Sequence, residues 1–421
     1  MSDARNLRKT TYRLYPTPKQ ALALDALLRS HQQLYNAALE ERISAWTKAC
    51  KSITYADQCK SLTVLRKELP EWAAAANCSS QQMTLRRLDK AFSAFFRRVK
   101  AGQAPGFPRF KSLARFPGFS FKSHGDGWRF TSEDGWRHGS LRLSGVGQVR
   151  ARGQARQGGE IRASDILRRD GRWYLSLTVE VAQIERGRCA DGALAYDWGL
   201  ERFLSGVTHA GEDVAIDNPR WWQQAKGEIV QLQQIVSRKG RSNRRKKAVR
   251  RLAQARAKLA RKRLNWTHQQ TAQLASRFAL VATEELSLKN MTRSAAGTVE
   301  KPGKQVAQKA GLNREILDTA PGLFTSLFRY KVLETGGEWV DAPTRSLKPS
   351  QRCPQCWHVA KKQLSQRQHC CEQCGYTENR DTASARVVLR WALEETSGQE
   401  LTETGVQRSR ETPSFAAHRV E

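Results

Sequence analysis

Apolar residues near the start of the chain recur with the spacing of amphipathic helices. Residues 8–16 alternate weakly and predict a short strand, after which Thr17 and Pro18 provide a helix start with proline in the first helical position. A later helix, after Ser79 and Ser80, places large apolar side chains on one stripe, namely Leu85, Leu88, Phe92, Phe95 and Val99. Stripes of this kind are typical of a packed core. The opposite face of the later helix is basic and is either plainly solvated or in contact with phosphates; its residues include Arg86, Arg87 and Lys90.

The pattern changes between residues 101 and 182. Glycine, proline and aromatic residues alternate there in short runs, which predict a small sheet or barrel, and the basic, glycine-rich stretch 150–162 predicts a loop. If the strand at 8–16 joins this sheet, the helices between them form an insertion into a β domain.

Two apolar segments of the second half each lead to a carboxylate. Residues 193–197 and 278–283 are apolar enough to predict buried strands, the first ending in Asp197 and the second followed by Glu284. Residues 203–208 predict another strand, 323–332 a helix and 337–340 a strand. We expect 293–308 to be a mobile loop and the polar tail beyond Trp391 to be disordered.

One helical segment is almost purely basic. Residues 238–263 hold fourteen lysines or arginines and no acid, and a thin apolar seam includes Ala248, Leu252 and Leu259. Uncompensated charge at this density destabilises a helix unless phosphates are near, which favours nucleic-acid contact over a merely solvated face. The densest part comprises Arg244, Arg245, Lys246, Lys247, Arg250 and Arg251.

The composition agrees with a nucleic-acid partner. The 421 residues carry a formal net charge of +32, spread along the chain, and are long enough for two or three domains. An anionic membrane surface is the competing partner, but it predicts basic amphipathic helices with large apolar anchors. Neither a leader nor an apolar run of 18 residues is present, which predicts a cytoplasmic, nucleoid-associated protein without a membrane partner.

Four of the nine cysteines form two Cys-x-x-Cys pairs. Two such turns can close a tetrahedral zinc shell, which is the signature of a structural site, whereas a disulfide pair or four unrelated thiols are the alternatives. The zinc ligands are therefore predicted to be Cys353, Cys356, Cys371 and Cys374. Cys370 competes with Cys371 as a ligand, but only Cys371 completes the second motif. Seven residues after Cys374 comes a third acid, Asp381.

Asp197, Glu284 and Asp381 form a candidate catalytic set. Each acid taken alone is more often a cap or an ion-pair partner. Hydrolysis of a phosphodiester by two divalent ions ~4 Å apart requires carboxylates from separate elements, and oxygen ligands suit Mg²⁺ or Mn²⁺.

Several motifs together resemble the TnpB-type RNA-guided nucleases of insertion sequences, relatives of the compact type V CRISPR effectors. They are Tyr-Asp-Trp-Gly-Leu at 196–200, Glu-Glu-Leu-Ser-Leu-Lys-Asn-Met at 284–291, and the two cysteine pairs leading to Asp381. Gly-Phe-Pro-Arg-Phe-Lys-Ser at 106–112 and Asp-Asn-Pro-Arg at 217–220 are also similar to family segments. The resemblance covers nearly the whole chain.

The resemblance implies a multidomain α+β protein with an RNase H-like (RuvC) nuclease domain. A wedge β-barrel would comprise 1–16 and 101–189, with a helical recognition domain, 17–100, inserted into it. The RuvC-like α/β domain would comprise 190–349 and 379–393, with a zinc ribbon that binds target nucleic acid, 350–378, inserted, and residues 394–421 would be a disordered tail. Asp197, Glu284 and Asp381 would be the catalytic, metal-binding acids.

The family's activity supplies the leading hypothesis, which is a magnesium-dependent DNA endonuclease. It would bind a transposon-derived guide RNA, recognise a short motif beside its double-stranded DNA target, and cleave after guide pairing; a monomer is favoured. The alternatives are a guide-dependent repressor that cleaves little and a transposase that acts directly on DNA ends.

Two residues depart from the family pattern. Trp357 stands where a glycine usually follows the second cysteine, and it is expected to distort or shield that turn. Ala383 replaces an asparagine two residues after the third acid and is followed by Ser384, so that support for the orientation of Asp381 is expected to be weaker.

Overall fold

The computed structural model describes residues 6–182, 192–238, 240, 242–298, 300–363 and 366–397. The chain divides into two compact units, Met1–Gln183 and Ile184–Glu421, each of which is described separately. The predicted boundary at residues 189 and 190, like Cys189, lies outside the described residues.

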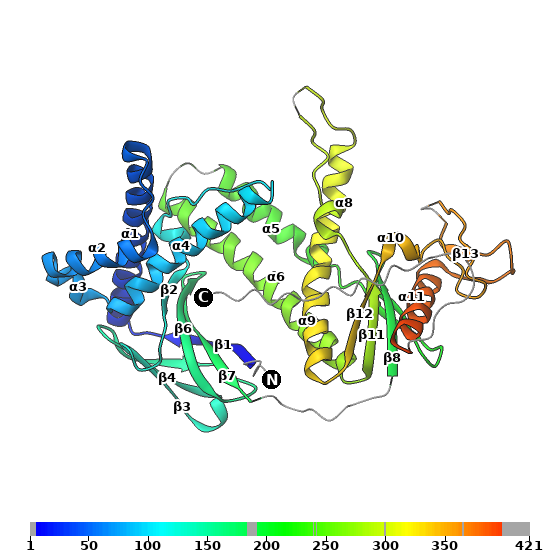
Figure 1. Ribbon diagram of the computed structural model, residues 1–421, viewed down its shortest axis with the longest axis horizontal. Helices are drawn as coiled ribbons and strands as arrows, with labels where there is room; N and C mark the ends of the chain where they lie inside the picture. The colour runs from blue at the N-terminus through cyan, green and yellow to red at the C-terminus, as the bar shows by residue number, and fades with distance from the viewer. Residues whose placement is uncertain are drawn as a thin grey trace. The chain divides into compact units, whose positions relative to one another are not determined.

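The first unit is built on a seven-stranded antiparallel sheet of order β2-β6-β7-β1-β5-β4-β3 (Figure 1). The strands are β1 (Asn6–Tyr15), β2 (Gly118–Phe121), β3 (Trp128–Ser132), β4 (His138–Leu143), β5 (Gly147–Arg152), β6 (Glu160–Arg169) and β7 (Arg172–Val181). The early strand does pair with the later ones. No pairing in the described part of the chain joins β2 to β3, so the sheet is not closed into a hydrogen-bonded barrel. The predicted loop 150–162 shortens to 153–159 because its ends continue β5 and β6.

Four helices lie between β1 and β2 in the chain. They are α1 (Pro18–Ala49), α2 (Tyr55–Glu68), α3 (Pro70–Ala75) and α4 (Cys78–Lys100), followed by two single 3₁₀ turns at Leu113–Arg115 and Asp134–Trp136. Thr17 caps α1 in a capping box, with Pro18 in the first turn as predicted. Helix α4 starts earlier than predicted, because Asn77 caps it. Its stripe is buried only at the beginning, at Leu85 and Leu88, whereas Val99 is 50% exposed.

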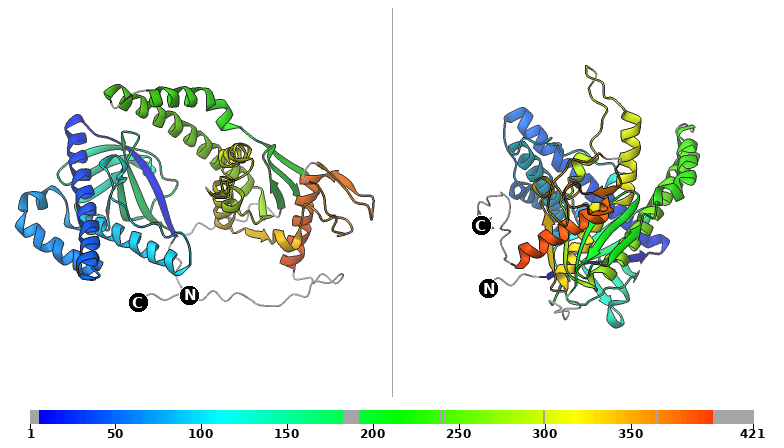
Figure 2. Two further views of the ribbon diagram at one scale, coloured as in Figure 1. Left: turned by 90° about the horizontal axis from the view of Figure 1, so that it is seen from above. Right: turned by 90° about the vertical axis from the view of Figure 1, so that its right-hand side faces the viewer.

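The second unit contains a five-stranded sheet of order β10-β9-β8-β11-β12 (Figure 2). The strands are β8 (Gly192–Trp198), β9 (Arg202–Thr208), β10 (Asp213–Asp217), β11 (Phe278–Glu284) and β12 (Glu338–Ala342). The hairpin partners β8, β9 and β10 are antiparallel, whereas β8, β11 and β12 run parallel. The parallel strands need long crossovers, and these crossovers supply the helices that cover one face of the sheet.

Helices cover both faces of this sheet: α6 (Asn243–Ala275) and α9 (Pro321–Glu334) pack on one face, and α11 (Arg380–Ser397) packs on the other. The remaining helices are α5 (Trp221–Arg238), α7 (Leu288–Met291), α8 (Val306–Thr319) and α10 (Thr344–Leu347), and a hairpin of β13 (Gln368–Cys370) and β14 (Thr377–Asn379) precedes α11. An aromatic core that includes Phe203, Phe324 and Phe328 joins α6 and α9 to one face. A core of smaller residues, including Ala195, Ala282 and Val388, joins α11 to the other.

Several expectations for this unit need correction. Helix α5 was not predicted, and α8 begins at Val306, inside the expected loop. Helix α11 continues to Ser397, so disorder beyond 393 is wrong for 394–397; the later residues lie outside the described range. No described helix is both long and apolar enough to span a membrane.

Candidate active site and metal centre

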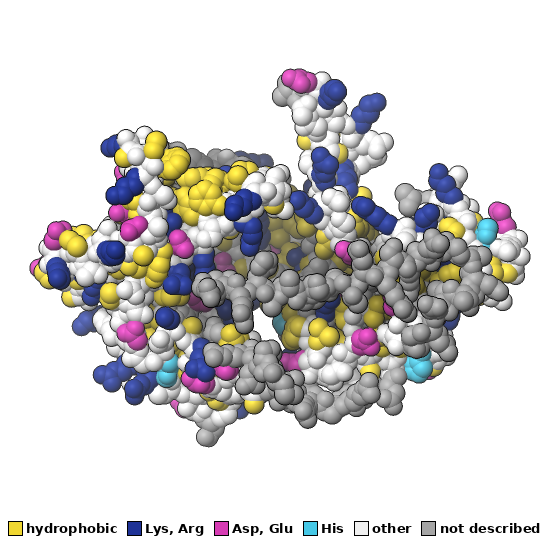
Figure 3. Space-filling view, viewed as in Figure 1, with side chains coloured by type: hydrophobic (Ala, Val, Ile, Leu, Met, Phe, Trp, Pro, Cys, Tyr) yellow, Lys and Arg dark blue, Asp and Glu magenta, His cyan; other side chains and the backbone are white. Residues whose placement is uncertain are grey.

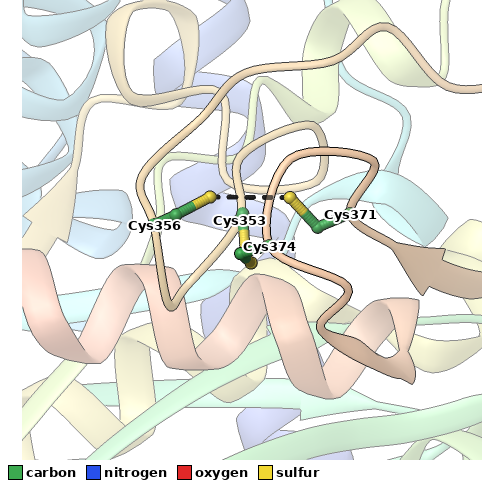
Figure 4. A group of neighbouring side chains, drawn as sticks. All are labelled: Cys353, Cys356, Cys371 and Cys374. Atoms are coloured by element: carbon green, nitrogen blue, oxygen red, sulfur yellow. Dashed lines mark hydrogen bonds between the residues drawn. The ribbon is translucent and has the colours of Figure 1, made fainter.

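The four predicted zinc ligands form one cluster (Figure 4). Their sulfur atoms all lie within 4.8 Å of one another, and this is the only such group of three or more metal-ligating side chains in the described residues. Cys353 Sγ lies 3.6 Å from Cys374 Sγ, and Cys356 Sγ lies 3.5 Å from Cys371 Sγ. These separations are too long for disulfides.

The cluster fits zinc. Four sulfurs bound tetrahedrally at about 2.3 Å from one ion lie about 3.8 Å apart, close to the sulfur separations found. Burial raises the pKa of the Cys353 and Cys356 thiols, whereas for Cys371 the amides of Cys374 and Gln373 outweigh burial and lower the pKa to about 6. Ionisation of all four thiols would therefore be coupled to metal binding. Cys370 is exposed and lies outside the cluster, as the spacing predicted.

The two knuckles have the same backbone geometry. In each, the amide of the fifth residue donates to the carbonyl of the first cysteine, from Trp357 to Cys353 at 3.0 Å and from Gly375 to Cys371 at 2.9 Å. Trp357 has φ +64°, and Gly375 has φ +73°. The expected distortion is absent, because Trp357 adopts the left-handed conformation that glycine adopts in the second knuckle.

Asp197 and Glu284 occupy neighbouring parallel strands. Tyr196 on β8 is in register with Thr283 on β11, so the next residues along, Asp197 and Glu284, lie side by side at the carboxyl ends of both strands. Side chains alternate along a strand, and Tyr196 faces the aromatic core. The two acids therefore face the opposite side, where α11 packs.

Asp381 comes to the same side from a different element. It lies in the first turn of α11, where the helix dipole favours a negative charge, and its amide donates to Asn379 Oδ1 at 3.0 Å. The neighbouring Arg380 turns its guanidinium to the carbonyls of Gln363 and Gln366, in the zinc module.

The acids influence one another. Burial raises the pKa of Asp197 well above its usual range, and the negative charges of Glu284 and Asp381 raise it further. Burial also raises the pKa of Glu284. Among the described residues, the three acids do not form a group whose ligand atoms are gathered closely enough to be a site for one ion. Oxygen-only donors suit Mg²⁺ or Mn²⁺.

Ser384 supports an acid that the sequence did not connect to it. Its hydroxyl donates to Glu284 Oε1 at 3.0 Å, and this bond opposes the upward pKa shift of the carboxyl. Ala383 is buried, 1% exposed, and offers no polar group. Ser384, three residues after Asp381, therefore supports Glu284 through its hydrogen bond.

We expect Ser384→Ala to weaken binding of divalent ions at neutral pH. Loss of the donated bond leaves the Glu284 carboxyl easier to protonate, so the pH at which Mn²⁺ binds half-maximally rises. A roughly tenfold loss of affinity at pH 7 is typical for removing such a support. Titration with Mn²⁺ between pH 5 and 9 measures it, and Ser384→Thr, which keeps the hydroxyl, is the control. A loss that is equal at every pH would contradict this role.

Without metal, Asp197 should destabilise the fold at high pH. Because its pKa is raised on folding, its contribution is fully favourable below the pKa of the unfolded chain and is lost as pH rises through the folded pKa. In chelator, Asp197→Asn should therefore raise the melting temperature at pH 8 by roughly 2–4 °C, equivalent to about 1 kcal/mol. The difference should vanish at pH 4. An unchanged melting temperature at pH 8 would refute the mutual repulsion.

The predicted nucleic-acid contacts fall into two groups. In the first unit, Arg86 stacks on Tyr55 with 4.8 Å to the ring centroid, Arg87 binds Gly118 O and the Ser120 hydroxyl, and Lys90 is exposed. Arg87 thus anchors β2 to α4. In the second unit, exposed residues cover the start of α6, and they are Arg244, Arg245, Lys246, Lys247, Arg250 and Arg251.

A further basic surface went unnoticed in the sequence. Strands β1, β3, β4 and β5 contain no acid, and their core-facing residues alternate with arginines, namely Arg13, Arg129, Arg142, Arg150 and Arg152. Arg13 is paired in register with Arg152, and Arg129 with Arg142. Like charges directly opposite each other are unfavourable. Arg13 and Arg152 both stack on the ring of Tyr15, with their guanidinium carbons 4.6 and 5.3 Å from its centroid. The alternation Arg-Ala-Arg at 150–152 was the sequence pattern that could have predicted this basic face of the sheet. Lysines and arginines are spread over the surface of both units (Figure 3).

Three family models match the chain in order. A model described as "Helix-turn-helix domain" (HTH_OrfB_IS605) matches residues 6–51, which here form β1 and α1. The OrfB_IS605 model, described as "Probable transposase", matches 176–295, and a model described as "Cas12f1-like, TNB domain" matches 322–388. The last range contains the four cysteines and Asp381.

Two curated proteins match over most of their length. The chain is 26% identical to "Putative RNA-guided DNA endonuclease InsQ" of Escherichia coli K12 over 388 residues, which cover 91% of this chain and 92% of that protein. It is 29% identical to a "Putative RNA-guided DNA endonuclease" of Streptomyces pristinaespiralis over 394 residues, covering 92% and 89%.

A solved structure shares the fold. The protein in the cryo-EM structure of the Cas12f1-sgRNA-target DNA complex superposes with a TM-score of 0.57 at 11% identity, covering 91% of this chain and 99% of that one. The fold is therefore multidomain α+β of the Cas12f type, with a RuvC-like domain and a TNB domain that carries the four-cysteine cluster.

Proposed function

Since the chain belongs to the IS605 OrfB/TnpB family, we propose that it is an RNA-guided DNA endonuclease that cleaves by two-metal hydrolysis. The observation that carries the chemistry is the convergence of Asp197, Glu284 and Asp381 on one side of the β8–β11 pair. The names of the two curated relatives support the guide-dependent activity.

Each acid has a distinct structural task in this mechanism. Asp197 and Glu284 are fixed by the parallel register of their strands, so they define a rigid edge for cation binding, whereas Asp381 arrives on a helix. Divalent ions held there would activate water and stabilise the leaving oxygen. Ser384 orients Glu284 and lowers its pKa against the effect of burial, and mutual repulsion of the acids favours cations over an empty site.

The rest of the protein would bind nucleic acid. The guide RNA and the DNA are polyanions, which suits the charge of +32, the exposed start of α6 and the arginine face of β1, β3, β4 and β5. Base pairing would read the target sequence, while the protein binds backbone shape and the motif beside the target. The zinc cluster holds the TNB domain that leads into α11.

The decisive experiment starts with the RNA that accompanies the protein. The full chain is purified from cells that contain its flanking DNA, and the bound RNA is sequenced. A discrete species with a guide segment, followed by magnesium-dependent cutting of a matching DNA, would support the proposal. Target binding without cutting would instead favour the repressor. DNA-end binding with no discrete RNA would favour a transposase.

We expect the start of α6 to contribute guide affinity. Replacing its six exposed basic residues (244–247, 250 and 251) with glutamine should weaken RNA binding and lower the slope of log K against log salt by about 0.7 for each phosphate that is no longer neutralised. Exchanging lysine and arginine at the same positions preserves charge and is the control. A salt slope equal to that of the wild type would exclude phosphate binding by this segment.

A further inference from the structure

Trp357 stands in a position that disfavours a side chain. Its φ of +64° lies in the left-handed region, which glycine enters freely and a bulky residue enters only under strain. At the equivalent position in the second knuckle, Gly375 has no neighbour within 4 Å of where a Cβ would stand. The first knuckle thus carries a large ring where the turn itself needs none, and contacts of that ring must offset the strain.

Two arginines stack on that ring. The guanidinium carbon of Arg352 lies 5.1 Å from the ring centroid of Trp357, and that of Arg390 lies 4.5 Å from it. Arg352 also donates to the carbonyls of Trp357 and Leu347, at 3.1 and 2.8 Å. We call Arg352, Trp357 and Arg390 the Trp357 clamp.

The clamp joins the first knuckle to α11. Arg390 is an α11 residue, and it donates to the carbonyls of Pro354 and Gln355 inside the knuckle, both at 3.2 Å. The half-buried ring of Trp357 packs against the small-residue core that seats α11 on the sheet. Figure 4 shows the two knuckles beside this helix. The first knuckle and α11 are therefore held together at one place by three kinds of contact: hydrogen bonds from arginine side chains to backbone carbonyls, stacking on the ring, and apolar packing.

The same helix carries the third acid. Asp381 and Arg390 are nine residues apart, or about 13 Å along a rigid helix axis. A movement at the clamp is therefore transmitted to the first turn. Two further links join the zinc-binding segment to α11: Arg386 binds Glu378 in β14, and Arg380, next to Asp381, binds the carbonyls of Gln363 and Gln366.

We propose that Trp357 and Arg390 are positioning residues, which couple the folded zinc module to α11 and so set Asp381 opposite Asp197 and Glu284. Neither residue touches the reacting atoms. The inference deepens the proposed function, because it takes Asp381 as a metal-binding acid. It explains why the chain has a strained tryptophan where glycine fits the turn.

The test uses the full-length protein with Trp357→Gly, which relieves the strained turn while removing the ring. The variant should retain one zinc per chain by mass spectrometry. Its Mn²⁺ affinity should fall about tenfold, the usual effect of removing a group that supports a metal ligand, and hydrogen exchange in the first turns of α11 should increase. Arg390→Ala should do the same. The double variant should lose no more than either single one, since both break one coupling.

Arg277→Ala is the matched control. It removes an arginine whose guanidinium carbon lies 5.2 Å from the ring centroid of Phe278, outside both knuckles and α11, so Mn²⁺ affinity should stay at the wild-type value. Wild-type Mn²⁺ affinity and exchange in Trp357→Gly, or losses that multiply in the double variant, would overturn the proposal. If Trp357→Gly does not fold, Arg390→Lys decides, because lysine keeps the charge but neither stacks as a plane nor reaches both carbonyls.

The outcome is separable from that of the proposed function. Cleavage is not needed for either readout, so a wild-type protein that fails to cut DNA refutes the nuclease while the clamp is still tested by Mn²⁺ affinity. If the wild type binds no Mn²⁺, hydrogen exchange in α11 alone supports or refutes the coupling.

Discussion

Asp197→Ala should abolish DNA cleavage and leave guide-dependent target binding intact. The side chain sits at the carboxyl end of β8, beside Glu284 and facing α11, where its removal deletes a ligand that neither remaining acid can replace. Loss of one metal-binding carboxylate should lower the cutting rate on the order of a thousandfold or more, equivalent to about 4 kcal/mol of barrier.

Cutting of a labelled duplex at fixed RNA and magnesium measures this effect, and gel-shift titration measures binding. Glu284→Gln and Glu285→Gln form a matched pair, because the two glutamates are adjacent in sequence but have different surroundings. Glu284 accepts a hydrogen bond from Ser384, whereas Glu285 is exposed. We expect the first to lose cleavage and the second to retain it. Cleavage that survives Asp197→Ala would exclude this acid from the chemistry.

Removal of zinc should unfold the TNB region and uncouple α11 from it. Metal binding at four thiolates supplies apparent free energies of about 10 kcal/mol or more, and for small modules this is folding free energy. Cys371→Ser should therefore lose the metal, with hydrogen exchange rising across 350–378 and cleavage falling along with it. Cys370→Ser provides the neighbouring control, since this exposed thiol lies outside the cluster. Zinc retained at full stoichiometry by Cys371→Ser would contradict the assignment.

The zinc ligands could be predicted because their signal is local. Each Cys-x-x-Cys turn is complete within five residues, so spacing alone distinguishes Cys371 from Cys370. The expected distortion of the turn at Trp357 was wrong for the opposite reason. Arg390, whose guanidinium stacks on the ring, is 33 positions later and offers no signal in the motif itself.

The sequence identified the three acids as candidates, but it could not show that they come together in the fold. Asp197 and Glu284 end or follow apolar segments, and Asp381 follows the second cysteine pair. Their convergence depends on parallel pairing between β8 and β11, across 87 residues, and on a helix that packs on the face of the sheet where Asp197 and Glu284 lie. In the sequence, Ser384 is only a small residue that follows Ala383, which stands where the family has an asparagine. Its bond to Glu284 spans 100 positions, and no periodicity reports such a contact.

The order of the acids along the chain has a consequence during synthesis. Asp197 and Glu284 can pair as soon as β11 leaves the ribosome, but Asp381 arrives only with α11, after both cysteine pairs have been translated. On the proposed function, a nascent chain would be able to bind RNA on its basic surfaces before it holds a complete set of acids. A prematurely terminated product ending before Arg380 would compete for guide without being able to cut.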